Sequence, residues 1–444
     1  MSEHRAFPKS VQAGIPRLGP KPDGWTTYAL GDLLEVVERP VRLDAEKHYQ
    51  LVTAKRNRGG IVERGRLRGR SIKTKTQFLT KSGDFLISRR QIAHGACGIV
   101  PSSLDNAVVS NEYATLQPTD RLNIDFLKHL TNTIYFQQTC FHSSIGVHVE
   151  KLVFNLEHWM TWQFHLPPLP GQRRIAAILD EWDKAIAIAE KLVDTRARRK
   201  NWLSRQIFRL SGDQTSGGDI QEVKISDIAE VIRGVGYDPT IDKSPEGGVR
   251  ILTAGNVQQR RITLQGDSTY VIEDIVPQRL LTQQDDFIVC MSNGSKHLVG
   301  KAGRCLNTPS EKMAAGAFCA TVRPKHSQSV RLLDQMFQSQ RYAELLHLAL
   351  AGSAIGNLAP SQLEDFLFFF TDSEKSIEEL ELIDRDLDQS TLLAELLSSQ
   401  KRGLMQKLLS GDLPVPESID RLLPGGQDVD DALEAEDQSA EATG

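Results

Sequence analysis

The chain has 444 residues, of which 40% are hydrophobic and 25% charged, and its formal net charge is −4. This composition is typical of a globular protein with room for two or more domains. No apolar run is long enough to cross a bilayer, and the opening MSEHRAFPKS lacks the apolar core of a signal peptide, so we expect a cytoplasmic protein without a membrane. The five cysteines form no CxxC and are predicted to be buried thiols: Cys97, Cys140, Cys290, Cys305 and Cys319.

The negative charge is concentrated at the C-terminal end. From Glu417 onward nine acidic residues face one basic residue, which leaves 48 acidic and 52 basic residues over 1–416. The end of the chain is polar, acidic and free of aromatic residues, a composition that predicts a disordered tail. The part of the chain expected to fold is therefore mildly basic.

The sequence contains an internal repeat. Segments of the first half return in the same order about 200 residues later, which chance similarity between strands does not explain. The paired segments are Tyr28–Leu33 with Val223–Ile228, Leu51–Ala54 with Ile251–Ala254, Leu79–Ile87 with Leu281–Val289, Ala114–Pro118 with Ala320–Pro324, and Arg199–Leu203 and Ser211–Asp213 with Lys401–Met405 and Ser410–Asp412.

Each half is predicted to contain a strand-rich domain followed by one long helix. Roughly 150 residues of short apolar runs, broken by Gly, Asp, Asn and Pro, precede each helix. The first helix is expected over Gln172–Arg209, after the prolines of 167–170, and the second from an N-cap at Ser373 to Leu409. Their apolar residues recur in alternating steps of three and four, which is coiled-coil spacing. We expect the two helices, each roughly 50–55 Å long, to pair antiparallel with each other, and pairing with other subunits is the alternative.

The predicted fold class is α+β, with two duplicated strand-rich domains separated by two long helices that form an antiparallel coiled coil. The predicted division is an N-terminal extension (1–22), a first domain (23–170), a central helical spacer (171–212), a second domain (213–371), a C-terminal helical spacer (372–412) and a disordered acidic tail (413–444).

Residues 55–75 form the densest positive cluster, with Glu63 as the single acid. Four interspersed glycines predict a hairpin or loop rather than a helix. Such a cluster neutralises DNA phosphates, and arginine also suits bidentate contacts to phosphate or guanine, although a solvated surface loop is the plain alternative. The cluster contains Lys55, Arg56, Arg58, Arg64, Arg66, Arg68, Arg70, Lys73 and Lys75, and Arg89, Arg90 and His94 are expected to extend it.

The corresponding region of the second half is polar rather than strongly basic. Its side chains can hydrogen-bond base edges but are equally common in turns. The candidates are Asn256, Gln258, Gln259, Arg260, Arg261, Asn293, Ser295, Lys296 and His297. Because the scaffold segments repeat while these loops differ, we expect each domain to read a different DNA sequence on a shared frame.

No catalytic motif was found. A DNA methyltransferase needs a polar residue before Pro-Pro and an aromatic after it, but Pro167-Pro168 lies between two leucines. Residues 294–302 resemble a phosphate-binding loop with one residue too many and Ala302 in place of Ser or Thr. Glu222-Val-Lys224 lacks the Pro-Asp of a nuclease, and the two histidines at 142 and 148 lack zinc-ligand spacing. We therefore predict a non-catalytic chain that binds no metal or cofactor itself.

The local sequence resembles the specificity subunits of type I restriction–modification systems over about residues 20–412. Pro22–Trp25 followed by Leu30–Leu33 is similar to the entry into that family's first target-recognition domain, and Leu166–Asp180 to the start of its central helical region. Asn293–Lys301 and Gly352–Leu358 resemble common segments of its second domain. Gly171 stands where the family usually has an acidic residue, and the segment before the second helix, Phe368–Asp372, lacks the proline-rich sequence that precedes the first helix.

The resemblance implies a specific function. The two domains would read the two halves of an asymmetric, interrupted double-stranded DNA target, and the helices would set the gap between the halves. Two methyltransferase subunits would bring S-adenosylmethionine, and motor–nuclease subunits would use ATP and Mg²⁺. The alternatives are the recognition subunit of a related modification–restriction system, a coiled-coil scaffold protein and an unrecognised nuclease.

Overall fold

The structure, a computed structural model, describes residues 16–74, 76–146, 152–209, 220–245, 247–258, 260–265, 268–351, 356–371 and 374–422. The chain divides into two units, each with its own core. Unit 1 comprises residues 1–188 and 394–444, and unit 2 comprises residues 189–393. No helix in these described ranges is long and apolar enough to span a membrane.

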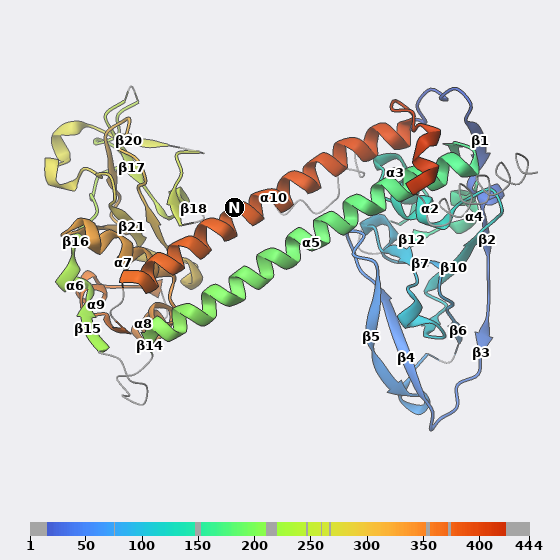
Figure 1. Cartoon of the computed structure of the whole chain (residues 1–444), viewed down its shortest axis with the longest axis horizontal. Helices are drawn as coiled ribbons and strands as arrows, with labels where there is room; N and C mark the ends of the chain where they lie inside the picture. Colours follow the sequence, from blue (N-terminus) through green and yellow to red (C-terminus); the bar gives the residue numbers. More distant parts are fainter. Residues whose placement is uncertain are drawn as a thin grey trace, which may run out of the picture. The chain divides into compact units, whose positions relative to one another are not determined.

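Unit 1 is built on two sheets (Figure 1). The first has the strand order β2-β10-β7-β8 and is antiparallel throughout. The second has the order β3-β6-β9-β4-β5, with β4 and β9 parallel. These strands are β2 (Leu34–Val36), β3 (Pro40–Val41), β4 (His48–Ala54), β5 (Ile61–Arg68), β6 (Gln77–Leu79), β7 (Phe85–Ser88), β8 (Cys97–Ile99), β9 (Val108–Ser110) and β10 (Tyr113–Pro118).

Short helices and two small strand pairs cover the first sheet of unit 1. The side chains of Phe85, Phe136 and Trp159 lie in one core with Leu179 and Leu408, so both long helices contribute to it. The covering elements are β1 (Thr26–Ala29) paired with β13 (Gln163–Leu166), β11 (Ser144–Ile145) paired with β12 (Val153–Phe154), and helices α1 (Leu30–Leu33), α2 (Ile124–Leu130), α3 (Ile134–His142) and α4 (Leu156–Met160).

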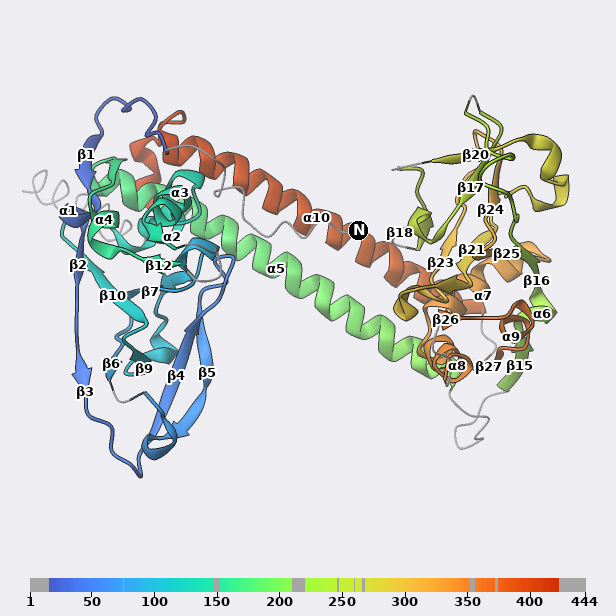
Figure 2. The same cartoon turned by 180° about the vertical axis from the view of Figure 1, so that it is seen from behind.

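Unit 2 repeats this plan (Figure 2). Its larger sheet has the order β16-β25-β21-β23-β19-β18, and a second sheet, β20-β17-β24, again contains one parallel pair, β17 with β24. The strands are β16 (Ala229–Arg233), β17 (Val249–Leu252), β18 (Val257–Gln258), β19 (Arg261–Ile262), β20 (Thr269–Val271), β21 (Phe287–Cys290), β23 (Ala302–Arg304), β24 (Met313–Ala315) and β25 (Cys319–Pro324).

The remaining elements of unit 2 are a small sheet, a strand pair and four helices. They are β14 (Phe208–Arg209), β15 (Ile220–Lys224) and β27 (Leu367–Thr371) in one sheet, β22 (Ser292–Asn293) paired with β26 (Gly356–Asn357), and helices α6 (Ile225–Ile228), α7 (Ser327–Gln338), α8 (Gln340–Ala349) and α9 (Pro360–Glu364). The order β2-β10-β7-β8 therefore matches β16-β25-β21-β23. The predicted duplication and the α+β class are confirmed.

Two long helices run through the chain: α5 (Leu169–Ile207, 39 residues) and α10 (Glu374–Ser410, 37 residues). Within each unit a segment of α5 lies beside a segment of α10 (Figure 1). In unit 1 Lys401 pairs with Asp183, and in unit 2 Lys200 pairs with Asp384. Because higher numbers on α5 contact lower numbers on α10, the helices are antiparallel, as predicted.

The helix ends differ slightly from the prediction. Helix α5 begins at Leu169, so Pro170 lies in its first turn, where the missing N–H of proline costs no hydrogen bond. It ends at Ile207 because Phe208 and Arg209 pair with Phe370 and Phe369 of β27. The predicted N-cap Ser373 lies outside the described residues. The other predicted domain boundaries remain predictions.

The disordered tail was predicted to begin at residue 413, but the structure has an ordered segment up to residue 422. Residues Glu417–Leu422 form a 3₁₀ helix, η10, and Arg174 of α5 binds Asp420 through two hydrogen bonds of 2.7 and 2.8 Å. Residues 413–422 therefore belong to unit 1, because a bidentate ion pair and a helical turn fix them, and residues 423–444 lie outside the described part. All five cysteines are buried and free, as predicted.

Candidate nucleic-acid interface

The basic cluster forms the β-hairpin β4–β5, which confirms the predicted hairpin. The turn at 55–60 needs left-handed backbone at Asn57, Arg58 and Gly60, with φ of 55°, 59° and 76°. The backbone N–H groups of Asn57 and Arg58 donate to the carbonyls of His94 and Gly95, at 2.8 and 3.0 Å. These bonds fix the turn against the loop after β7.

The arginines along β5 differ in their carboxylate partners. Arg66 and Arg68 lie opposite Gln50 and His48 of β4, and their nearest carboxylates are those of Glu63 (3.4 Å) and Glu46 (3.9 Å). Arg64 is the extra residue of a bulge, since Val52 pairs with Glu63 and Leu51 with Gly65.

The rest of the cluster is exposed as well. Arg70 pairs with Glu46 at 3.0 Å, and the side chains of Lys55, Arg56 and Lys73 are exposed. The side chain of Arg64 has no hydrogen-bond or ion-pair partner in the described ranges. Arg64 is therefore the side chain of β5 that is most available to a phosphate, and Lys75 lies outside the described residues.

The three residues predicted to extend the cluster differ in exposure. Arg90 is exposed and binds Glu112 at 2.8 Å, which raises its pKa. The Nε of Arg89 donates to the carbonyl of Tyr113. His94, in contrast, has only 5% of its surface exposed, because the hairpin turn packs over its short helix, η3 (Ile92–His94). His94 is therefore part of the fold beneath the hairpin turn, and its contact with DNA stays a prediction.

In unit 2 two predicted contacts serve the fold instead. Asn256 is buried, and its amide accepts from the backbone N–H of Thr253 (2.9 Å) and donates to the carbonyl of Thr263 (3.0 Å). These bonds use the amide of Asn256 inside the loop, and its contact with DNA stays a prediction. Gln258 is exposed but donates to the carbonyl of Gly255.

The two neighbouring arginines of unit 2 bind acids of α10. Arg260 contacts Asp384 (3.1 Å) and Asp388 (3.4 Å), and Arg261 contacts Asp388 (3.1 Å). Both are therefore engaged within unit 2, and for them DNA contact would require exchanging a carboxylate for a phosphate. Gln259 lies outside the described residues.

The last predicted group lies between β22 and β23. The side chain of Asn293 accepts a hydrogen bond from the backbone N–H of Ser295 at 2.9 Å, which closes a turn. Ser295, Lys296 and His297 are exposed there. The loop that resembles a phosphate-binding motif is thus a turn between strands, as predicted, and its part in DNA binding remains a prediction.

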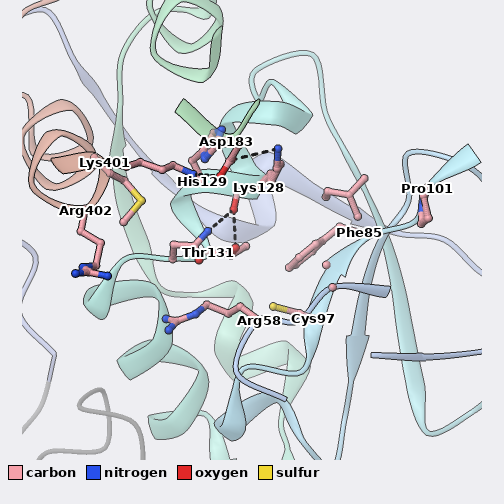
Figure 3. A pocket seen from close by; sticks show the side chains of 15 residues that line it. Arg58, Phe85, Cys97, Pro101, Lys128, His129, Thr131, Asp183, Lys401 and Arg402 are labelled. Atoms are coloured by element: carbon pink, nitrogen blue, oxygen red, sulfur yellow. Dashed lines mark hydrogen bonds and ion pairs between the residues drawn. The ribbon is translucent and has the colours of Figure 1, made fainter. Parts of the chain in front are cut away.

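A cavity of about 540 Å³ opens in unit 1 between the hairpin turn, α2, α5 and α10. Figure 3 shows Arg58, Lys128, Lys401 and Arg402 around it. Of these four residues, the sequence predicted only Arg58 as a DNA-binding candidate. Lys128, Lys401 and Arg402 lie on helices, and nothing in their local sequence distinguishes them from solvated residues.

Asp180 is the centre of an ion-pair cluster at this cavity. It accepts from Lys128 at 2.7 Å and from Nε2 of the buried His129 at 2.9 Å. Burial raises the pKa of Asp180, but the hydrogen bonds from His129 and Lys128 outweigh it and hold the pKa at about 2. Among the described residues, His129, Asp180 and Asp183 are the one group that could converge on a metal ion. Because Lys128 and Lys401 already bind these carboxylates, we assign the cluster to helix packing.

The comparisons with known proteins agree with this architecture. Residues 22–195 match the sequence family described as "Type I restriction modification DNA specificity domain". The chain is 27% identical over 180 residues to the type I restriction enzyme StySPI specificity subunit of Salmonella potsdam, and 26% identical over 180 residues to the EcoKI specificity subunit of Escherichia coli K12. Each match covers 40% of this chain and 37% of the relative, so the chain spans little more than a third of these relatives.

A solved structure shares the fold over a longer part of the chain. The crystal structure of the type I restriction–modification system S subunit from M. genitalium superimposes with a TM-score of 0.55 and 14% identity, covering 88% of this chain and 97% of the other. By these matches residues 22–195 are similar to a DNA specificity domain of the type I class, as the sequence predicted. The described chain also shares the fold of a type I S subunit.

Proposed function

We propose that this chain is the DNA specificity subunit of a type I restriction–modification complex and performs no chemistry itself. Each unit reads one half of a bipartite, asymmetric double-stranded DNA target. The helices α5 and α10 fix the spacer between the halves and dock two methyltransferase subunits. Those subunits supply S-adenosylmethionine, and motor–nuclease subunits supply the ATP- and Mg²⁺-dependent steps.

One observation carries this proposal: the two units share a scaffold but differ in the segment that follows the repeated strand residues Leu51–Ala54 and Ile251–Ala254. In unit 1 that segment is the turn and the arginine-rich strand β5, and in unit 2 it is the short pair β18–β19. A shared frame with different side chains at one position is expected of two readers of different half-sites. A coiled-coil scaffold protein needs no such difference.

The test begins with the methylated adenines of cells that express this chain with its methyltransferase partners. Sequencing identifies the bipartite target, and a gel-shift titration then compares DNA carrying that target with DNA in which one half-site is scrambled. We expect specific binding about 10³-fold or more tighter than non-specific binding. Equal affinity for the target and the scrambled DNA would contradict the proposal, and metal-dependent cleavage by the isolated chain would favour a nuclease.

A further inference from the structure

The cavity of unit 1 has an apolar floor and several cations at its rim. Phe85, Ile99 and Met405 are among its apolar lining residues. Arg58 enters from the hairpin turn and Arg402 from α10 (Figure 3). The question is which of these cations already has an anionic partner.

Two of the four cations are neutralised within unit 1. Lys128 binds Asp180 at 2.7 Å, and Lys401 binds Asp183 at 2.5 Å. Arg58 and Arg402 have no ion-pair or side-chain hydrogen-bond partner in the described part of the chain, and no dashed line reaches either of them in Figure 3. Partial burial lowers the pKa of Arg58, as expected of a guanidinium that lacks a compensating carboxylate.

In unit 2 the arginine of the comparable turn has carboxylate partners. There Arg260, which like Arg58 has a left-handed backbone (φ 65°), binds Asp384 and Asp388 one turn apart on α10. Within the long helices the ion pairs set the register of the repeat at 201 residues, one fewer than the sequence pairing of Arg199–Leu203 with Lys401–Met405. Asp183 and Asp384 are 201 residues apart, as are their partners Lys200 and Lys401.

The same register assigns Ala187 of α5 to the position of Asp388, again 201 residues apart. Asp183, the counterpart of Asp384, is already shared by Lys128 and Lys401. Unit 1 therefore lacks the carboxylate that holds the turn arginine in unit 2. The sequence change from Asp to Ala at this position explains why Arg58 is left without a partner.

We propose that Arg58 and Arg402 of unit 1 together bind one phosphate group at this cavity. Guanidinium groups match phosphate oxygens with paired, charge-assisted hydrogen bonds. The source is either a DNA backbone phosphate, which rests on the proposed function, or a free phosphate. In unit 2 the corresponding arginine, Arg260, is instead bound by Asp384 and Asp388.

The experiment uses the full chain with Arg58→Ala, Arg402→Ala, the double variant and Ala187→Asp. The last restores the carboxylate of unit 2 on an exposed helix position without removing a cation. Arg385→Ala, an exposed arginine elsewhere on α10, is the matched control. One arm measures the melting temperature against inorganic phosphate at constant ionic strength, with chloride as the reference. The other measures the salt dependence of DNA binding.

In the first arm we expect the wild type and Arg385→Ala to show a phosphate-dependent rise in melting temperature that the four site variants lose, whatever their baseline stability. In the second arm each site variant should reduce the steepness of the negative slope of log K against log salt by about 0.9. The double variant should reduce it by the same amount, since one phosphate is shared.

The outcomes separate the two sources. A fall in the slope assigns the phosphate to DNA, whether or not free phosphate raises the melting temperature. If phosphate raises the melting temperature but the salt slope does not change, the ligand is free phosphate. The same holds if the chain binds no DNA, in which case the phosphate site stands although the proposed function fails. Site variants that behave like the control in both arms overturn the proposal, and so does a double variant whose slope falls by about twice 0.9, which would mean two separate contacts.

Discussion

Arg39 binds the fully buried carboxylate of Asp84 through both of its terminal nitrogens, at 2.7 and 3.1 Å. Gln117 of β10 donates a third side-chain hydrogen bond to Asp84, at 3.1 Å. In unit 2 the corresponding aspartate, Asp286, is bound instead by Arg323 of β25, at 2.8 and 2.9 Å. Gln117 and Arg323 hold the same place in the repeat, in QP and RP before the end of the strand. The two units therefore bind an equivalent buried aspartate with arginines from different places: Arg39 lies in the loop before β3, and Arg323 lies on β25.

This relationship predicts a rescue. Arg39→Ala leaves Asp84 buried without a cation and should lower the free energy of unfolding of unit 1 by about 3–5 kcal/mol. Adding Gln117→Arg reproduces the arrangement of unit 2 and should recover most of that loss. Urea denaturation followed by tryptophan fluorescence measures both, with Arg42→Ala as the exposed control. A double variant no more stable than Arg39→Ala would contradict the shared role.

The acid stability of unit 1 should depend on Asp180. Its pKa is held at about 2, below the value near 3.9 of an unfolded chain, so its contribution is present above about pH 4 and is lost as the pH falls toward 2. Asp180→Asn should therefore be less stable than the wild type at pH 5, by on the order of 1–2 kcal/mol because the group is partly screened, and equally stable near pH 2. Urea titrations at each pH test this, and a difference that persists at pH 2 would point to packing instead.

Much of the fold follows from the sequence because the repeat and the helical spacing are local patterns. Segments such as Leu79–Ile87 and Leu281–Val289 keep their turn and strand residues, so the two sheets could be expected. The helix end at Ile207 could not be predicted, since it depends on Phe208 finding Phe370 more than 160 residues later. The structured part of the tail was missed for the same reason, because Asp420 is fixed by the distant Arg174.

The candidate site was predicted less completely. A dense cluster such as that on β5 is visible in composition, whereas burial of His94 and Asn256 depends on which loops pack over them. Arg402 follows Lys401 on α10, and only the fold brings it to the cavity with Arg58. Sequence pattern locates charge, and packing decides which charges remain available.

The two equivalent aspartates of the long helices should differ in their contribution to stability. Asp384 is buried and binds Lys200, Arg260 (3.1 Å) and Gln335 (2.9 Å). Burial lowers the pKa of Lys200, and Asp384 opposes that shift. Asp384→Ala leaves a buried ammonium unpaired and should cost about 3–5 kcal/mol. Its counterpart Asp183 has a side chain that is 40% exposed, so Asp183→Ala should cost no more than about 1 kcal/mol. Equal losses in denaturation would contradict this difference.

The arginines of β5 should differ in their contribution to DNA binding. Arg64 has no carboxylate partner in the described ranges, whereas Arg66 and Arg68 lie near Glu63 and Glu46 and must leave those acids to meet a phosphate. Arg64→Ala should thus weaken DNA binding most and lower the salt slope by about 0.9, if it meets one phosphate. Glu63→Gln frees Arg66 and should strengthen binding at low salt, without changing the preferred sequence.

A base contact would give a different signature from a phosphate contact. If Arg64, Arg66 or Arg68 reads a base, its alanine variant should relax specificity at one position of the target by about 1–3 kcal/mol and leave the other positions unchanged. The triple variant compared with Arg385→Ala, titrated on target and scrambled DNA over a range of salt, separates the two roles. Unchanged affinity and unchanged salt slope in the triple variant would assign the hairpin to ordinary solvated surface, because no phosphate or base contact could then be lost.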